Sequence, residues 1–476
     1  MNDGKLSSWL KKEINPIRRR TVPSPLARKI GRTFQILVLV VLCSFVLWRV
    51  LLYLDVNRRF ARIRTSGLPT SGADLNGWPR PVTDAENGAL DLTQAFSLVR
   101  TFPDRRSNEV VEPKILSRTN VWGPATRALV EAYIQTNQPA LARVQESLLL
   151  PKFRYPVDYS YGPETELPHL GGLKAIARIA ALQTAIEAEG GHADQWPENV
   201  AFQLKLARTL DDEPTLISHL VRSAIIRMAV KATERSLNRV TPSNEACKRL
   251  QDAFTRVGET NLLPLAFVGE RALMIPTFRL SWKEIQGFSH GDGQENQPRK
   301  PQRYSGKPTM FLWLTGFFER DLDFFLETME KSTSLAALPP PQNLTLTNYL
   351  QSAGDIAQRR FYILSGMFLP SHSRVILREA STQALIELAT AALAVERFRL
   401  GRGRLPDDLR ELTPQFLDAI PKDPFDGAAL RYRRLARGYI IYSVDADGHD
   451  DGGREGPERK KLADNGLYDL TFIVER

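Results

Sequence analysis

The feature that most constrains this chain is a long apolar run near its N-terminus. From Ile36 to Trp48 all residues but one are apolar, and Val50–Leu54 continues the run beyond Arg49. As a helix, the 19 residues from 36 to 54 measure about 28 Å, which matches a hydrocarbon core of roughly 30 Å. Arg49 lies near the downstream end, where its aliphatic stem lets the guanidinium reach the headgroups. The sequence therefore predicts a transmembrane helix over residues 34–55.

Basic residues are concentrated around this run. The whole chain has 64 Lys and Arg against 54 Asp and Glu, whereas residues 1–64 alone carry 14 basic and 3 acidic residues. Nine of these basic residues precede the run and 4 follow it. The positive-inside rule then predicts a basic cytoplasmic tail over 1–33, with the bulk of the chain on the other side of the membrane. We expect a single-pass protein of the bacterial inner membrane whose body is periplasmic.

Three other interpretations of this end are weaker. A cleaved signal peptide needs a small-x-small site soon after the run, and residues 55–64 (DVNRRFARIR) contain none. The Arg18–Arg20 run is similar to a twin-arginine export signal, but two prolines and a long gap separate it from the apolar residues. A basic arm can bind nucleic acid, although beside a span it more often binds anionic lipid. We therefore expect the bilayer, and not nucleic acid, as the partner of this end.

The two cysteines are compatible with a bacterial envelope location. Cys43 lies within the apolar run and Cys247 is the one cysteine beyond it, so the soluble part can form no internal disulfide. No CxxC motif and no Cys/His cluster of the zinc-binding type is present.

The body, residues 66–370, is expected to be helical. Apolar residues recur at three- and four-residue spacing in 214–237, and the Ala-rich segment 167–190 ends at a glycine pair. Thr83 and Glu86 have the spacing of a capping box at the start of a helix over 83–101. Further helices are expected at 122–149, 196–210, 243–257, 309–332 and 344–366. Short turns between helices of this length are typical of helix-pair arrays, although no fixed period repeats.

Residues 286–308 interrupt the helical pattern and are expected to form a flexible loop, because they are rich in Gly, Pro, Gln and Asn. Within them, Gly287-Phe288-Ser289-His290-Gly291 matches the G-x-S-x-G motif of α/β hydrolases. That motif requires a strand before the serine and a helix after it, and the flanking residues predict neither. A membrane-anchored hydrolase using Ser289 is therefore an alternative. A ligand-binding helical module, with an apolar pocket within 167–275, is another.

The most informative polar segment is Tyr442–Gly453 (YSVDADGHDDGG). It places Asp445, Asp447, Asp450 and Asp451 within seven positions, among glycines that allow tight turns. Carboxylates this close repel one another unless a cation or water lies between them. Hard oxygen ligands without cysteine favour Ca²⁺ over Zn²⁺. A solvated acidic turn is the alternative interpretation, since Asp and Gly are common turn residues.

The order of motifs over residues 377–470 resembles the C-terminal domain of the major pseudopilins of type II secretion systems. An amphipathic helix ending at Gly401 is followed by these motifs: Gly403-Arg404-Leu405-Pro406, Pro421–Gly427 (PKDPFDG), Leu430–Tyr432, Tyr439–Ser443, the acidic segment and Tyr468-Asp469-Leu470. The resemblance implies a small α+β domain over 371–476, with an antiparallel sheet and a calcium site that holds the last strands together.

The resemblance also implies particular ligands. Asp447 and Asp469 match the acidic ligand positions of the family, and Val444 matches a backbone carbonyl ligand. Asp450 and Asp451 are further candidates that the resemblance does not fix. The chain departs from the family at Asp445, where the family has glycine and where an extra carboxylate favours a divalent cation.

The remainder of the chain differs from a pilin. A charged insert, Arg454–Lys461, precedes Asp469, and the apolar run is far from the matching helix and lacks the family's processing site. The whole chain is similar to uncharacterised bacterial envelope proteins that place a helical body between a single span and a pseudopilin-like tip. We expect a mainly α, non-enzymatic protein that contacts other envelope proteins, by analogy in a secretion or pilus-like assembly.

Overall fold

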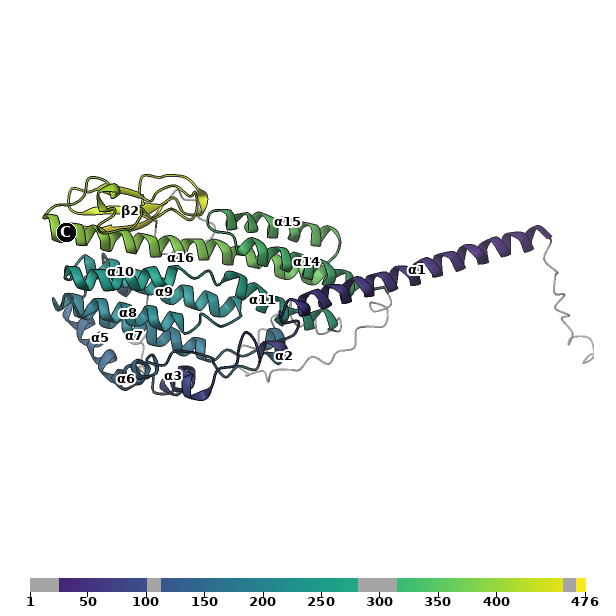
Figure 1. Cartoon of the computed structure of the whole chain (residues 1–476), viewed down its shortest axis with the longest axis horizontal. Helices are drawn as coiled ribbons and strands as arrows, with labels where there is room; N and C mark the ends of the chain where they lie inside the picture. The colour runs from purple at the N-terminus through teal and green to yellow at the C-terminus, as the bar shows by residue number, and fades with distance from the viewer. Residues whose placement is uncertain (1–24, 101–112, 281–314, 457–467) are drawn as a thin grey trace, which may run out of the picture. The chain divides into compact units, whose positions relative to one another are not determined.

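The computed structural model describes residues 25–100, 113–280, 315–456 and 468–476. The chain divides into two compact units, Met1–Asp55 and Val56–Arg476. The predicted fold class is confirmed: the described chain is mainly helical, with a long apolar helix near the N-terminus and a small antiparallel sheet near the C-terminus (Figure 1).

Helix α1 (Pro25–Thr65) contains the apolar run and extends beyond it at both ends. Its large apolar side chains between Phe34 and Leu54 are almost all exposed. A core helix of a soluble protein buries such side chains, because each square ångström of apolar surface removed from water stabilises by about 25 cal/mol. Lys29–Thr65 is long and apolar enough to cross a membrane.

The last turns of α1 belong to the second unit and pack into it. Val56 and Ile63 are buried in an apolar cluster that includes residues of α14 (Phe317–Ala336). Beside them, the guanidinium of Arg59 lies 2.5 Å from Asp323 Oδ1 and 2.8 Å from Glu327 Oε2, both on α14. The end of α1 is therefore attached to the second unit by apolar and ionic contacts.

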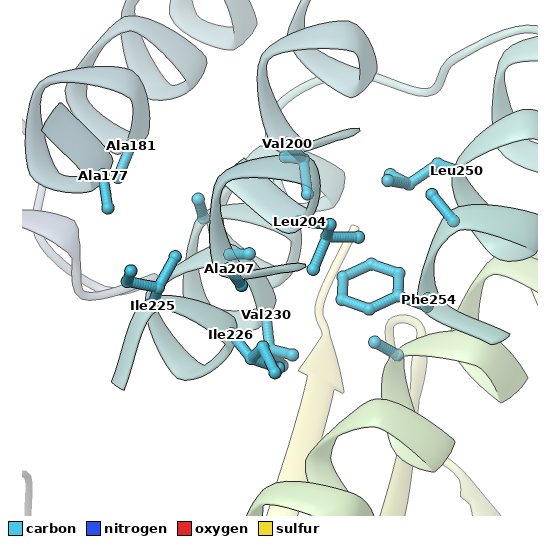
Figure 2. Packing of buried hydrophobic residues seen from close by; sticks show 14 of the residues in the cluster. Ala177, Ala181, Val200, Leu204, Ala207, Ile225, Ile226, Val230, Leu250 and Phe254 are labelled. Atoms are coloured by element: carbon cyan, nitrogen blue, oxygen red, sulfur yellow. The ribbon is translucent and has the colours of Figure 1, made fainter. Parts of the chain in front are cut away.

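The largest apolar core lies among five helices: α7 (His169–Glu189), α8 (Trp196–Arg208), α9 (Leu216–Leu237), α10 (Asn244–Gly258) and α16 (Ile363–Arg402). Small alanines on α7 and α8 allow neighbouring helices to approach closely and interdigitate. Figure 2 shows side chains from four of these helices meeting: Ala177, Ala181, Val200, Leu204, Ala207, Ile225, Ile226, Val230, Leu250 and Phe254.

A second apolar cluster is built from α11 (Leu263–Met274), α14, α15 (Thr345–Arg359) and the first part of α16. The short helical turns elsewhere are α2 (Gly72–Leu75), η1 (Asp84–Glu86), η2 (Pro113–Leu116), η3 (Tyr159–Glu164), η4 (Ile275–Arg279), η5 (Gln342–Leu344), η6 (Leu409–Leu412) and η7 (Asp445–Asp447).

Helix α16 joins the two clusters, because its early residues pack in the second and its later residues in the first. It starts where the carboxylate of Asp321 accepts hydrogen bonds from the amides of Leu364 (2.9 Å) and Ser365 (3.1 Å). It runs through Pro370 and ends at Gly403, whose φ of 69° suits a helix terminus. The predicted boundary between 66–370 and 371–476 thus falls inside one continuous helix.

The predicted helix over 122–149 is two helices, α5 (Pro124–Thr136) and α6 (Gln138–Ser147). The break is at Asn137, whose buried amide bonds to the backbone of Arg100 and to the carbonyl of Tyr133. A proline follows in the first turn of α6, where it has no amide hydrogen to continue the preceding helix.

The capping box predicted at Thr83 and Glu86 is wrong. The helix α3 (Gly88–Phe96) starts later and is capped by Asn87, whose Oδ1 accepts from the amide of Ala89 (3.2 Å). Asn87 is fixed there by a long-range contact, because its side chain also bonds to both backbone groups of Arg154.

The C-terminal sheet has the order β1 (Arg431–Arg434), β2 (Tyr439–Ser443) and β3 (Leu470–Val474), and both pairs are antiparallel. Every residue of the central strand β2 is buried. One face of β2 packs on α16, where the hydroxyl of Tyr439 donates to the fully buried carboxylate of Glu396 (2.9 Å). In Figure 1 this strand lies along α16.

Candidate functional site

The acidic segment leaves the end of β2 and folds back over the outer face of the sheet. At Gly453, with φ of 79°, a Cβ atom would lie 2.8 Å from Ile440 Cδ1 and 3.0 Å from Tyr442 Cδ1. Gly448 and Gly452 also have positive φ, at 70° each. These turns and this close approach require glycine, and they bring the later part of the acidic segment against Asp469, the residue before β3.

Asp469 is the most buried of the predicted carboxylate ligands, with 5% of its surface exposed. Its Oδ2 accepts a hydrogen bond from the amide of Gly453 (2.7 Å), whereas its Oδ1 is buried and has no hydrogen-bond partner among the described residues. Burial, together with the negative charges of Asp450 and Asp451, raises the pKa of the Asp469 carboxyl. A buried carboxylate oxygen without a donor is costly, so this position favours an additional positive group.

Asp451 has the same feature, because its Oδ2 is buried and has no hydrogen-bond partner in the part of the chain that the structure describes. Asp450 is more exposed, and its Oδ1 accepts from the amide of Gly452 (2.9 Å). Its Oδ2 lies 3.8 Å from the guanidinium of Arg431 on β1. The charges of Asp450 and Asp451 act on Asp469, and these three residues are called the acidic group below. Among the described residues, Asp451 and Asp469 each have one buried carboxylate oxygen without a hydrogen-bond partner.

The other predicted ligands lie outside this group of three. The exposed Asp447 accepts from the amide of His449 (3.1 Å) within its own turn. Asp445 Oδ1 lies 3.3 Å from the hydroxyl of Ser381 on α16. The amide of the buried Val444 donates to Asp423 Oδ2 (2.9 Å). The positions that the family resemblance implied are thus divided between separate turns.

The donor chemistry fits a hard divalent cation, because the unpaired groups are carboxylate oxygens. Among the residues that the structure describes, however, no three His, Cys, Asp or Glu side chains converge as a formed metal centre. Within the described residues, the acidic group offers two buried carboxylate oxygens that lack a hydrogen-bond donor, together with the more exposed carboxylate of Asp450. If a cation binds here, Asp450, Asp451 and Asp469 are the residues that would hold it.

One important residue of this region was not predicted from the sequence. Asp423 is completely buried and its carboxylate joins the loop before β1 to the end of β2. It accepts four hydrogen bonds, from the amides of Phe425 (3.0 Å) and Val444 (2.9 Å), the hydroxyl of Ser443 (2.9 Å) and the guanidinium of Arg431 (2.7 Å). The only sequence signal was its position between two prolines in the motif 421–427.

The alternative catalytic residue, Ser289, and the predicted loop 286–308 lie outside the described residues, as do most of the tail 1–33 and of the charged insert. Two buried histidines are held by carboxylates: His169 lies 3.0 Å from Glu213, and His219 lies 2.9 Å from Glu379. Each pair connects two separate helices or turns.

No protein-family model, characterised protein or solved structure matches the chain. The resemblance to pseudopilins therefore remains a prediction from the order of the sequence motifs.

Proposed function

We propose that this chain is a membrane-anchored, non-enzymatic protein of the bacterial envelope that acts through contacts with other envelope proteins. The observation that carries the proposal is the long apolar surface of α1, which no part of the described chain covers. A lipid bilayer would cover this surface, and a helix satisfies all its backbone hydrogen bonds internally, as a span must. The flanking charges favour a cytoplasmic N-terminus and a periplasmic body.

The apolar run and the first residues of the second unit belong to one helix, α1, which supports an anchoring role for the run. The same helix passes from the apolar run into the second unit, where Val56 and Ile63 are buried and Arg59 pairs with α14. Val56, the first residue of the second unit, follows Leu54, the last residue of the run, by two positions.

The proposal further assigns Ca²⁺ to the acidic group at the C-terminal sheet. The cation would neutralise Asp450, Asp451 and Asp469 and would satisfy the two buried oxygens that lack a donor. Because Asp469 leads directly into β3, such a cation would tie the acidic segment to the last strand. Ligand binding to the native state stabilises by about 2.7 kcal/mol at a concentration one hundred times Kd.

Thermal unfolding of the full chain in detergent tests this assignment. We expect excess Ca²⁺ to raise the unfolding midpoint relative to a chelator, and Asp469→Asn to remove this response. Asp355→Asn is the control, because it removes an exposed carboxylate on α15, away from the C-terminal sheet. An unchanged midpoint, or an equal response in Asp469→Asn and in the wild type, would remove Ca²⁺ from the proposal.

The role in protein contacts rests on the pseudopilin resemblance and is by analogy. Strand β1 forms an edge of the sheet, and Arg433 on it is exposed. A photo-crosslinking residue at Arg433 is expected to give a defined adduct with another envelope protein in cells. Adduct formation only with lipid, or none at all, would contradict this part of the proposal.

A further inference from the structure

A cavity of about 670 Å³ lies within the second unit, and Asp450, Asp451 and Asp469 do not line it. Its walls are the middle of α16, the end of α10 with the residues that follow it, and the connecting segments 337–343 and 417–424. This volume is in the range of roughly 300–1,000 Å³ that is typical of small-molecule sites.

One face of α16 supplies the polar wall of the cavity. Glu379, Gln383, Glu387 and Thr390 all line it, and their spacing of three or four residues places them on the same side of the helix. The two carboxylates only accept hydrogen bonds, and the amide and the hydroxyl can accept as well as donate.

The two glutamates of this face differ in their partners. Glu379 is satisfied within the protein, because it accepts from His219 (2.9 Å) and from the hydroxyl of Ser223 (3.1 Å). Although burial opposes it, this environment lowers the pKa of Glu379 to about 2. Glu387 accepts from Gln383 Nε2 (2.8 Å), and in the described parts of the chain it forms no salt bridge. Burial raises the pKa of Glu387.

Two further oxygens on the cavity wall lack partners. Thr390 Oγ1 and Asn343 Oδ1 are buried, and neither forms a hydrogen bond with any residue that the structure describes. The two residues come from different walls of the cavity. Glu259 and Asp418 add exposed carboxylates to the lining, against one lysine, Lys422. The cavity is therefore acidic and rich in unpaired acceptors, so it suits a ligand that donates hydrogen bonds and carries positive charge.

We propose that this cavity binds a linear aliphatic polyamine, with one ammonium group on Glu387 and the chain directed toward the acidic lining. An ammonium group has three donors and no acceptor, so it complements a carboxylate beside unpaired oxygens. Several charges along one flexible chain match several carboxylates better than a single inorganic ion does. Bound there, the ligand would bridge α10, α16 and the segment 417–424, and so stabilise the contact between the helical body and the C-terminal region.

Calorimetric titration of the full chain in detergent with spermidine tests the proposal. We expect saturable binding that Glu387→Gln weakens roughly tenfold, or about 1.4 kcal/mol, because the variant lacks the carboxylate charge that would pair with the ammonium group. Asp355→Asn, the loss of an exposed carboxylate elsewhere, is expected to bind as the wild type does. Thermal unfolding without ligand shows whether Glu387→Gln is folded, and its midpoint is expected to equal or exceed that of the wild type.

Three results would overturn the proposal. The first is the absence of saturable spermidine binding by the wild type. The second is equal affinity of the wild type and a folded Glu387→Gln variant. The third is full competition by Mg²⁺ at equal charge, which would mean that binding reflects general screening of an acidic surface.

Discussion

Replacement of Asp423 by alanine should destabilise the C-terminal region strongly. The carboxylate of Asp423 is fully buried and accepts hydrogen bonds from two amides, one hydroxyl and the guanidinium of Arg431. Alanine leaves these donors without their acceptor. The donors come from the segment before β1, from β1 itself and from the end of β2, so one side chain connects three parts of the chain.

The expected loss of unfolding free energy follows from the burial of the hydrogen-bond partners of Asp423. Removing one member of a buried ion pair costs about 3–5 kcal/mol, because the remaining charge is left uncompensated. Arg431 is partly exposed and keeps its contact with Asp426, which reduces that cost. The amides of Phe425 and Val444 lose a charged acceptor, at about 1.5–3 kcal/mol for each hydrogen bond, and these terms are not additive. We therefore expect about 4 kcal/mol for Asp423→Ala, within the range for a broken buried pair.

Urea unfolding of the full chain in detergent, combined with hydrogen exchange, measures this effect. The amide of Val444 should exchange faster in Asp423→Ala, because its acceptor is removed. The matched control is Asp426→Ala, which removes a more exposed carboxylate from the same arginine and should cost about 1 kcal/mol or less. Equal destabilisation by the two variants, or unchanged exchange at Val444, would refute the reasoning.

Two further predictions concern an ion pair and a close backbone contact. Because the pKa of Glu379 is lowered to about 2 from an ordinary 4.5, its stabilising effect should be present above pH 4.5 and lost as the pH falls toward 2. Glu379→Gln should remove that part of the acid dependence and cost on the order of 2–3 kcal/mol at neutral pH, as measured by unfolding across pH. A Cβ at Gly269 would lie 1.6 Å from the Pro214 carbonyl oxygen, so Gly269→Ala should destabilise by about 3 kcal/mol. Gly401→Ala is the control, because a Cβ there would lie 3.8 Å from Phe416, which is an ordinary van der Waals distance. This variant should leave the stability unchanged or raise it by about 0.5–1 kcal/mol. Similar unfolding midpoints for the two alanine variants would contradict the packing argument.

Local sequence patterns were sufficient to predict the fold class. A run of apolar residues and a three-to-four-residue spacing act within one helix, so the apolar helix near the N-terminus and the helices around α9 could be predicted without tertiary contacts. The ends of the helices were harder to predict from the sequence, because they depend on contacts with residues far away in the chain. Asn87 caps α3 while it is held by Arg154, and Asn137 ends α5 while it binds Arg100.

The acidic group could be located from the sequence, but its internal arrangement could not. Composition alone treats Asp447 and Asp451 alike, whereas in the structure Asp447 is exposed in its own turn and Asp451 has a buried oxygen without a donor. The difference arises from the turns at Gly452 and Gly453 and from the packing of Gly453 on β2. Glu387 likewise could not be singled out from the sequence, because the cavity that it lines is formed by segments far apart in the chain.

Site-directed cysteine labelling tests the central claim, a single-span anchor with the body outside the cytoplasm, most directly. In a chain with Cys43→Ala and Cys247→Ala, one cysteine is introduced either at Ser8 in the basic tail or at Ser334, which is exposed at the end of α14. We predict that a membrane-impermeant maleimide labels Ser334→Cys in intact spheroplasts and labels Ser8→Cys only after the membrane is opened. Labelling of Ser8→Cys with protection of Ser334→Cys, or recovery of the protein in the soluble fraction, would contradict the account.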